Sequence, residues 1–254
     1  VLPNSLKSAL VPCFAGIRRR TGWRGELRYG LLNDLRVLDQ EALPQMAQRF
    51  LALGLPRGAT LPRLMPGPRL QADPSAAAAA PARLGLETGR DTLALCPGAE
   101  FGPAKQWPAS YFAQLAADYL ERGWQVLLLG SANDREVCAQ VRLESGARER
   151  CHDLAGRTSL AEAVDLLSLA SAVASNDSGL MHIAAALGRP LLAIYGATSP
   201  DFTPPLGDAV AVLQPTLSCA PCFQRDCPLG HHRCMRDTGP ELAAATLDDL
   251  LTRQ

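Results

Sequence analysis

The amino-acid sequence predicts an α/β fold whose larger part is a doubly wound parallel sheet. From about residue 90 onward, short apolar strands alternate with helices, which is typical of βαβ units. Residues 172–195 contain one such unit in full: an apolar strand, a polar turn, a helix and a second apolar strand. A proline- and glycine-rich stretch over 57–90 separates this part from residues 1–56, so we predict two domains joined by a linker.

Apolar runs and helical periodicity place the elements in order. Before residue 57, helices are predicted over 6–14 and 43–53, with a basic loop and a short strand between them. The alanine run over 76–80 is predicted to form a short helical turn within the linker. After residue 90, the predicted strands cover 92–96, 125–129, 152–154, 172–174, 191–195 and 209–213, and the predicted helices cover 110–122, 134–143, 160–170, 180–187 and 240–251.

Capping residues mark several of these helix ends. Ser159 and Thr238 precede helices as predicted N-caps. Gly188 ends the helix before it, and Pro190 prevents that helix from resuming.

Composition narrows the function classes. The chain has 254 residues, of which 47% are hydrophobic, enough for a real core. A formal net charge of zero argues against a general nucleic-acid binder, and no apolar run is long enough to span a membrane. We expect no signal peptide, and Val1 lies in what resembles the tail of a strand, so we expect part of a first domain to precede it. The only lysines are Lys7 and Lys105, which points to sites that need a compact ammonium group, with codon usage as the alternative.

Polar or glycine-rich loops follow most of the predicted strands. They cover 97–108, 130–134, 155–159 and 176–182, with 196–200 as a possible fifth. Because the carboxyl ends of parallel strands meet at one edge of a sheet, these loops converge where α/β proteins bind ligands. The helix that starts near residue 179 also presents unpaired N–H groups that suit a phosphate. The sequence therefore predicts a nucleotide site at this edge.

Individual residues of these loops have two interpretations each. Lys105 is a candidate to neutralise a phosphate, and Asp134 either binds a ribose or caps the helix that it begins. Asp177 caps its helix or faces a ligand, and His182 is a site residue or a partly buried surface residue. The 97–108 loop has neither a Walker A pattern nor a G-x-G-x-x-G pattern, which disfavours an NAD oxidoreductase.

Three motifs carry a resemblance to a known family. CPGAEFGPAKQWP, GSANDRE and SNDSGLMHIAAALGRPLLAIYGATSPDFTPP resemble the ADP-heptose:lipopolysaccharide heptosyltransferases of glycosyltransferase family 9. LPNSLKSA and RTGWRGELRYGLLND resemble that family's N-terminal domain. The resemblance implies a GT-B fold of two Rossmann-like domains with parallel sheets, the N-terminal one incomplete in this chain. Residues 1–56 would be the C-terminal part of the acceptor domain, 57–90 the linker and 91–254 the donor domain.

The resemblance also implies an activity. It is inverting transfer of L-glycero-D-manno-heptose from ADP-heptose to a heptose of the lipopolysaccharide inner core, with no required cofactor. The family's general base is an aspartate near the start of the N-terminal domain, so we expect this fragment to lack it and to be inactive alone. We further expect a cytoplasmic protein with peripheral contact to the cytosolic face of the bacterial inner membrane. Alternatives are a related family 9 transferase with another acceptor, or a non-catalytic nucleotide-binding module with a four-cysteine metal site.

The donor candidates are carried over from the family by position, whereas the acceptor candidates follow from their charge and their place in the predicted acceptor domain. The acceptor candidates are basic residues of the first part, Lys7, Arg20 and Arg24. The donor candidates are Lys105, Asp134, Thr158, Asn176, Asp177, Ser178, Gly179, Leu180 and His182.

Four cysteines lie close together near the C-terminus. Cys219, Cys222, Cys227 and Cys234 follow the spacing C-x2-C-x4-C-x6-C, which begins like a zinc knuckle without matching a standard finger. A structural zinc that fixes this loop is one interpretation, an iron–sulfur cluster is another, and free thiols are equally compatible. The remaining cysteines, Cys13, Cys96, Cys138 and Cys151, resemble ordinary small buried residues.

Overall fold

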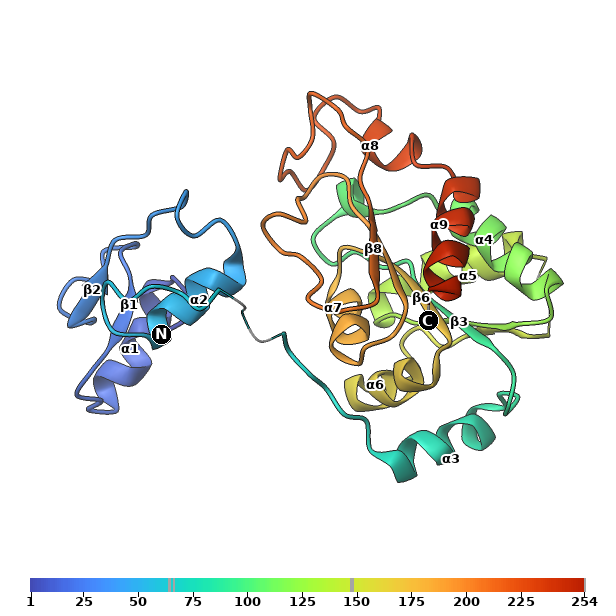
Figure 1. The fold of residues 1–254 in the computed structure, drawn as a ribbon, viewed down its shortest axis with the longest axis horizontal. Coiled ribbons are helices and arrows are strands. Elements are labelled where there is room, and N and C mark those ends of the chain that lie inside the picture. Colours follow the sequence, from blue (N-terminus) through green and yellow to red (C-terminus); the bar gives the residue numbers. More distant parts are fainter. Residues whose placement is uncertain (64, 66, 147–148, 254) are drawn as a thin grey trace. The chain divides into compact units, whose positions relative to one another are not determined.

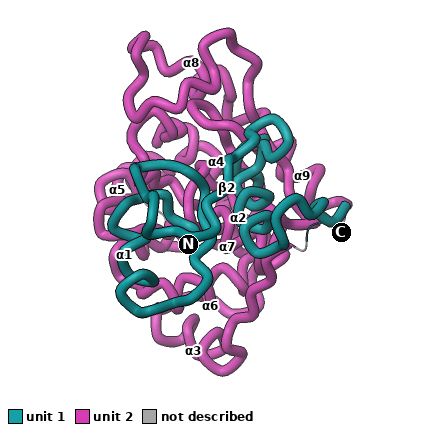
Figure 2. The backbone as a smooth tube through the Cα atoms, turned by 90° about the vertical axis from the view of Figure 1, so that its left-hand side faces the viewer, with its two compact units in different colours: residues 1–66, 201–204 teal, residues 67–200, 205–254 magenta. Residues whose placement is uncertain are grey.

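The computed structural model describes residues 1–63, 65, 67–146 and 149–253 (Figure 1), which belong to two compact units (Figure 2). Unit 1 is Val1–Pro66 with Asp201–Pro204, and unit 2 is Gly67–Pro200 with Pro205–Gln254. The finer division predicted above, with a linker over 57–90, stays a prediction. Within the described ranges, no helix is both long and apolar enough to cross a membrane.

Unit 1 combines two helices with a small parallel sheet. Its elements are α1 (Leu6–Phe14), β1 (Thr21–Trp23), β2 (Asp34–Arg36) and α2 (Met46–Gly54), and β1 pairs with β2 in parallel. Asp34 organises this unit, because its carboxylate accepts hydrogen bonds from Thr21, Arg36 and Arg57. Arg36, first among these donors, holds the pKa of the Asp34 carboxyl well below its usual range.

Unit 2 is built on one six-stranded parallel sheet. The strand order is β5-β4-β3-β6-β7-β8, so the chain builds outward from β3 on one side and then returns to build from β6 on the other. The order therefore reverses between β3 and β6, and this switch point is where doubly wound sheets bind ligands. The strands are β3 (Thr92–Cys96), β4 (Gln125–Leu128), β5 (Cys151–Asp153), β6 (Ala172–Asn176), β7 (Leu191–Ile194) and β8 (Val210–Leu213).

Helices cover both faces of the sheet (Figure 1). The longer helices are α3 (Pro74–Leu84), α4 (Ala109–Glu121), α5 (Arg135–Glu144), α6 (Leu160–Leu169), α7 (Gly179–Ala186) and α9 (Pro240–Thr252). The shorter ones are η1 (Pro103–Lys105), η2 (Ala132–Asp134) and α8 (Arg233–Arg236). Because successive side chains of a strand point to opposite faces, Leu93 and Leu95 pack toward α4, α5 and α9, whereas Ala94 and Cys96 pack toward α6 and α7.

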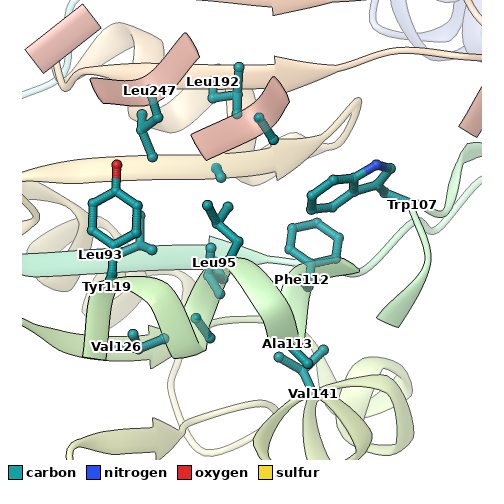
Figure 3. Close-up of a cluster of buried hydrophobic side chains, with 14 of the residues drawn as sticks. Leu93, Leu95, Trp107, Phe112, Ala113, Tyr119, Val126, Val141, Leu192 and Leu247 are labelled. Atoms are coloured by element: carbon teal, nitrogen blue, oxygen red, sulfur yellow. The ribbon is translucent and has the colours of Figure 1, made fainter. Parts of the chain in front are cut away.

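Aromatic side chains fill the core on the α4 face (Figure 3). The Phe112 ring is fully buried and packs edge-to-face on Trp107, with ring centroids 4.8 Å apart. Trp107 donates its indole N–H to the carbonyl of Thr238 at 2.8 Å. The predicted capping role of Thr238 is therefore wrong: Gly239 is the N-cap of α9, and Thr238 anchors the indole instead.

The alanine run over 76–80 forms more than the short turn expected from the sequence. It lies in α3, an eleven-residue helix whose start is capped by the Asp73 carboxylate and whose end is a left-handed Gly85. Ala77 and Ala80 are buried, and α3 packs against α6. Alanine has the highest helix propensity, and its small side chain permits close packing. Contact with α6 therefore stabilises a helix longer than the composition of this segment alone indicated.

We predict that Phe112→Ala lowers the free energy of unfolding by about 3–5 kcal/mol, because it leaves a cavity beneath Trp107. Urea unfolding followed by far-UV circular dichroism measures the loss. Leu143→Ala is the control, since Leu143 is 71% exposed on α5 and its truncation should change stability by less than about 0.5 kcal/mol. Equal effects of the two substitutions would contradict this assignment of the core.

Candidate functional site

Asn176 fixes the loop that crosses the switch point. It ends β6 and is fully buried. Its amide nitrogen donates to the carbonyl of Pro97 at 2.7 Å, and its amide oxygen accepts the backbone N–H of Trp107 at 3.1 Å. One side chain thus holds both ends of the 97–107 loop, which carries Lys105. This gives Asn176 a structural task, while its predicted contact with a donor stays a prediction.

Lys105 and Asp177 form a nearly buried ion pair at this edge of the sheet. The Lys105 Nζ lies 2.6 Å from Asp177 Oδ2, and the two side chains are 14% and 6% exposed. Thr198, in the loop after β7, donates its hydroxyl to the same carboxylate oxygen at 2.6 Å. The Lys105 ammonium also lies 4.9 Å from the centroid of the Phe101 ring. Removing such charges from water is costly, so the pair depends on these additional contacts.

The start of α7 presents backbone N–H groups to the same region. In the described part of the chain, its N-cap Ser178 makes no side-chain capping hydrogen bond, and Asp177 is directed to Lys105 instead. The predicted capping role of Asp177 is therefore wrong. A Cβ placed on Gly179 would meet nothing within 4 Å, so the first turn opens onto free space. The helix dipole makes this end favourable for an anion.

A cavity of about 500 Å³ extends from the start of α7, a size typical of small-molecule sites. Its apolar wall includes Leu129, Leu160 and Ile183. Cys96 lines it too, and burial raises the pKa of its thiol to about 12, so the thiol stays neutral. Five of the predicted donor residues line this cavity together: Asp134, Thr158, Ser178, Gly179 and Leu180.

Asp134 does not have the predicted role of capping the helix that it begins: it precedes α5, and in the described structure its side chain makes no capping hydrogen bond to that helix, but closes the short helix η2 before it. Its carboxylate accepts the backbone N–H of Ser131 at 2.7 Å and the Ser131 hydroxyl at 2.8 Å, in a capping box. Two glycines leave room for the Asp134 side chain. A Cβ on Gly98 would lie 2.3 Å from the Asp134 carboxylate, and a Cβ on Gly130 would lie 2.7 Å from the Cβ of Asp134. Its predicted contact with a ribose stays a prediction.

His182 lies on α7 close to the ion pair. Burial lowers the pKa of its imidazole below the ordinary value; the negative Asp177 opposes this shift and the positive Lys105 adds to it. The net direction is downward, so the imidazole is neutral at pH 7. A neutral imidazole offers one hydrogen-bond donor and one acceptor to a ligand.

The cysteine-containing segment supports the two loops that carry Lys105 and Thr198. The Arg225 carbonyl accepts the backbone N–H of Ala104 at 3.0 Å, and the backbone N–H of Phe223 donates to Ala197 at 2.7 Å. Gly196 leaves room for Met235, whose sulfur would lie 2.3 Å from a Cβ at that position. Sequence reasoning missed this role, because these are backbone contacts between distant segments and have no local signal.

The four cysteines of that segment are free thiols. Among the described residues, no three or more His, Cys, Asp or Glu side chains are grouped so as to hold a metal ion. Burial raises the pKa of Cys234, whereas backbone N–H groups, that of His232 first, lower the pKa of Cys227. The structure gives no support to a metal site here, and the zinc ion inferred from the spacing stays a prediction.

The predicted acceptor residues lie in unit 1. Arg20 donates its Nε to the Leu31 carbonyl at 2.6 Å and its Nη1 to the Ile17 carbonyl at 2.7 Å. Lys7 and Arg24 are exposed, and within the described ranges their side chains have no hydrogen bond or ion pair. Their contact with an acceptor stays a prediction.

A parallel sheet with an anion-favouring helix start and an apolar cavity at its switch point defines a nucleotide-binding α/β protein. Comparison with known proteins gives the family. Residues 1–233 match the model of glycosyltransferase family 9 (heptosyltransferase), and the chain belongs to this family.

Curated relatives match the whole chain. It is 45% identical over 261 residues to "Lipopolysaccharide heptosyltransferase 2" of Escherichia coli strain K12, covering 100% of this chain and 75% of the relative. It is 44% identical over 265 residues to "Lipooligosaccharide heptosyltransferase 2" of Haemophilus influenzae, covering 100% of this chain and 76% of the relative.

Solved structures confirm the predicted fold class. The structure of E. coli ADP-heptose LPS heptosyltransferase II matches with a TM-score of 0.89 at 44% identity, covering 99% of this chain and 75% of that one. A family 9 glycosyltransferase from Veillonella parvula shares the fold, with a TM-score of 0.81 at 19% identity, covering 100% of this chain and 73% of that one.

We predict that Asn176→Ala lowers the free energy of unfolding by about 2–4 kcal/mol, because a buried carbonyl and a buried N–H lose their partner. Hydrogen exchange followed by mass spectrometry should show faster exchange at residues 97–107. Asn133→Ala, at an exposed position in η2, is the control and should leave both measurements unchanged. Unchanged exchange in this loop of the Asn176 variant would refute its role as the anchor.

Proposed function

We propose that this chain carries the donor site of an inverting glycosyltransferase, which moves L-glycero-D-manno-heptose from ADP-heptose to a heptose of the lipopolysaccharide inner core. The observation that carries the proposal is the match of the whole chain, at 44–45% identity, to 75–76% of the length of heptosyltransferases 2. The arrangement of Lys105, Asp177 and the start of α7 beside an apolar cavity supports it, because such a site suits a nucleotide diphosphate.

In this proposal the donor lies across the switch point. Its adenine enters the cavity between Leu129, Leu160 and Ile183, and its ribose approaches Asp134 and Thr158. Its diphosphate meets Lys105 and the N–H groups that begin α7, next to Ser178, Gly179 and Leu180. The neutral His182 is available to hydrogen-bond a hydroxyl of the sugar.

Charge stabilisation is the main catalytic contribution that we propose for these residues. An acceptor hydroxyl attacks the anomeric carbon of the heptose from the side opposite the diphosphate and gives its proton to a general base, which we assign to no residue of this chain, so the configuration inverts. The bond to the phosphate oxygen breaks, and negative charge grows on the departing ADP. The Lys105 ammonium and the α7 dipole are already in place to receive that charge, so little reorganisation is needed during the reaction.

Unit 1 would provide the acceptor contacts. Lys7 and Arg24 are exposed cations that can meet the anionic groups of the inner core, and Arg20 offers its remaining N–H groups. We also propose a position at the cytosolic face of the inner membrane with peripheral contact to it, because a lipopolysaccharide acceptor is anchored by its lipid part.

The proposal predicts that Lys105→Ala weakens ADP binding by roughly 10–100-fold. The substitution removes a charge-assisted bond to phosphate and leaves the Asp177 carboxylate unpaired beside it. Isothermal titration calorimetry with ADP measures the effect, with GDP, UDP and NAD as competitors for selectivity. Lys7→Ala removes the only other lysine and should bind ADP with wild-type affinity.

Two results would count against the proposal. Equal binding of all four nucleotides would remove ADP as the recognised group, and wild-type affinity in the Lys105 variant would remove this lysine from the site.

A further inference from the structure

We propose that Thr198 is a positioning residue of the donor site. Its hydroxyl fixes the Asp177 carboxylate and, through it, the Lys105 ammonium. The inference rests on the proposed function, since Lys105 is taken to receive the diphosphate of the donor. It assigns a specific task to the 196–200 loop, which the sequence predicted only as a possible fifth loop at the ligand-binding edge of the sheet.

The Thr198 hydroxyl donates a hydrogen bond to the Asp177 carboxylate. Thr198 is 7% exposed, and its Oγ1 lies 2.6 Å from Asp177 Oδ2, the distance expected of a charge-assisted bond. The same oxygen receives Lys105 Nζ at 2.6 Å. Two donors on one oxygen leave the carboxylate little rotational freedom.

The backbone around Thr198 is held on both sides. Gln214, directly after β8, donates its side-chain amide to the Thr198 carbonyl at 2.9 Å. The preceding carbonyl, that of Ala197, accepts the backbone N–H of Phe223 at 2.7 Å. Residues that follow β6, β7 and β8 therefore form one hydrogen-bonded chain, from Asp177 through Thr198 to Gln214.

This series of hydrogen bonds matters most when a ligand weakens the ion pair between Lys105 and Asp177. A phosphate that draws Lys105 toward itself leaves Asp177 as a nearly buried carboxylate with one donor fewer. A buried charge without partners is strongly unfavourable, so the bond from Thr198 keeps the carboxylate satisfied and oriented during this exchange. Without the Thr198 hydroxyl, the Asp177 carboxylate would be buried with too few partners, and the cost of this would reduce the binding free energy of the phosphate.

Thr198→Val is nearly isosteric and removes only the hydroxyl, whereas Thr198→Ser keeps it. We expect Thr198→Val to weaken ADP binding about 5–20-fold in calorimetry, as befits one charge-assisted hydrogen bond, and Thr198→Ser to restore affinity to within about two-fold of the wild type. Thr216→Val is the matched control at an exposed threonine and should have no effect. If Thr198→Val does not fold, Thr198→Ala compared with Thr198→Ser provides the same contrast.

A double-mutant cycle separates positioning from general stability. In an Asp177→Asn background, Thr198→Val should change ADP affinity by less than about two-fold, because its effect passes through the carboxylate. A full effect in that background would overturn the proposal, as would wild-type affinity of Thr198→Val or failure of Thr198→Ser to rescue. Absence of ADP binding to the wild-type chain would instead overturn the proposed function and this inference with it.

Discussion

The parallel pairing of β3 with β6 at the centre of the sheet is the constraint on which the rest of unit 2 depends. Its register sets Cys96 opposite Ser175, so both strands deliver their next residues to the same edge. Asn176 then closes the 97–107 loop over that edge, and Asp177 follows it within reach of the lysine that the loop carries. A sheet built in simple sequential order would have no reversal here, and the two loops would have no crevice to share.

The ion pair at this edge explains how the proposed diphosphate site can be stable before the diphosphate binds. A lone ammonium group of low exposure would be costly, and Asp177 neutralises it. In the proposed function, the diphosphate of the donor replaces Asp177 as the anionic partner of Lys105, and the start of α7 adds its N–H groups. The protein therefore holds its charges in position before the donor arrives. A rigid sheet edge is suited to such preorganisation, because it keeps the charged groups in place and little reorganisation is needed during the proposed reaction.

Sequence reasoning located the strands and the helix α7 because apolar runs and glycine or proline boundaries are local signals. It also identified the loop with Lys105 and the turn before Gly179, since both follow strands directly. It could not find the bond from Trp107 to Thr238, which joins residues 131 positions apart, or the contact of Thr198 with Asp177. It also predicted only a short helical turn for the alanine run of α3, because composition does not report the packing of an alanine helix on α6. What it missed are long-range contacts that exist only once the sheet has formed.

A crystal structure of the chain with ADP would test the central claim most directly. The account predicts the β-phosphate within hydrogen-bonding distance of Lys105 Nζ and of the backbone N–H groups that begin α7, with adenine in the cavity that Thr158 and Leu180 line. Asp177 should then have kept its bond to Thr198 while sharing or losing that to Lys105. Nucleotide bound elsewhere, or bound here with the Lys105–Asp177 pair unchanged and no phosphate beside it, would contradict the account.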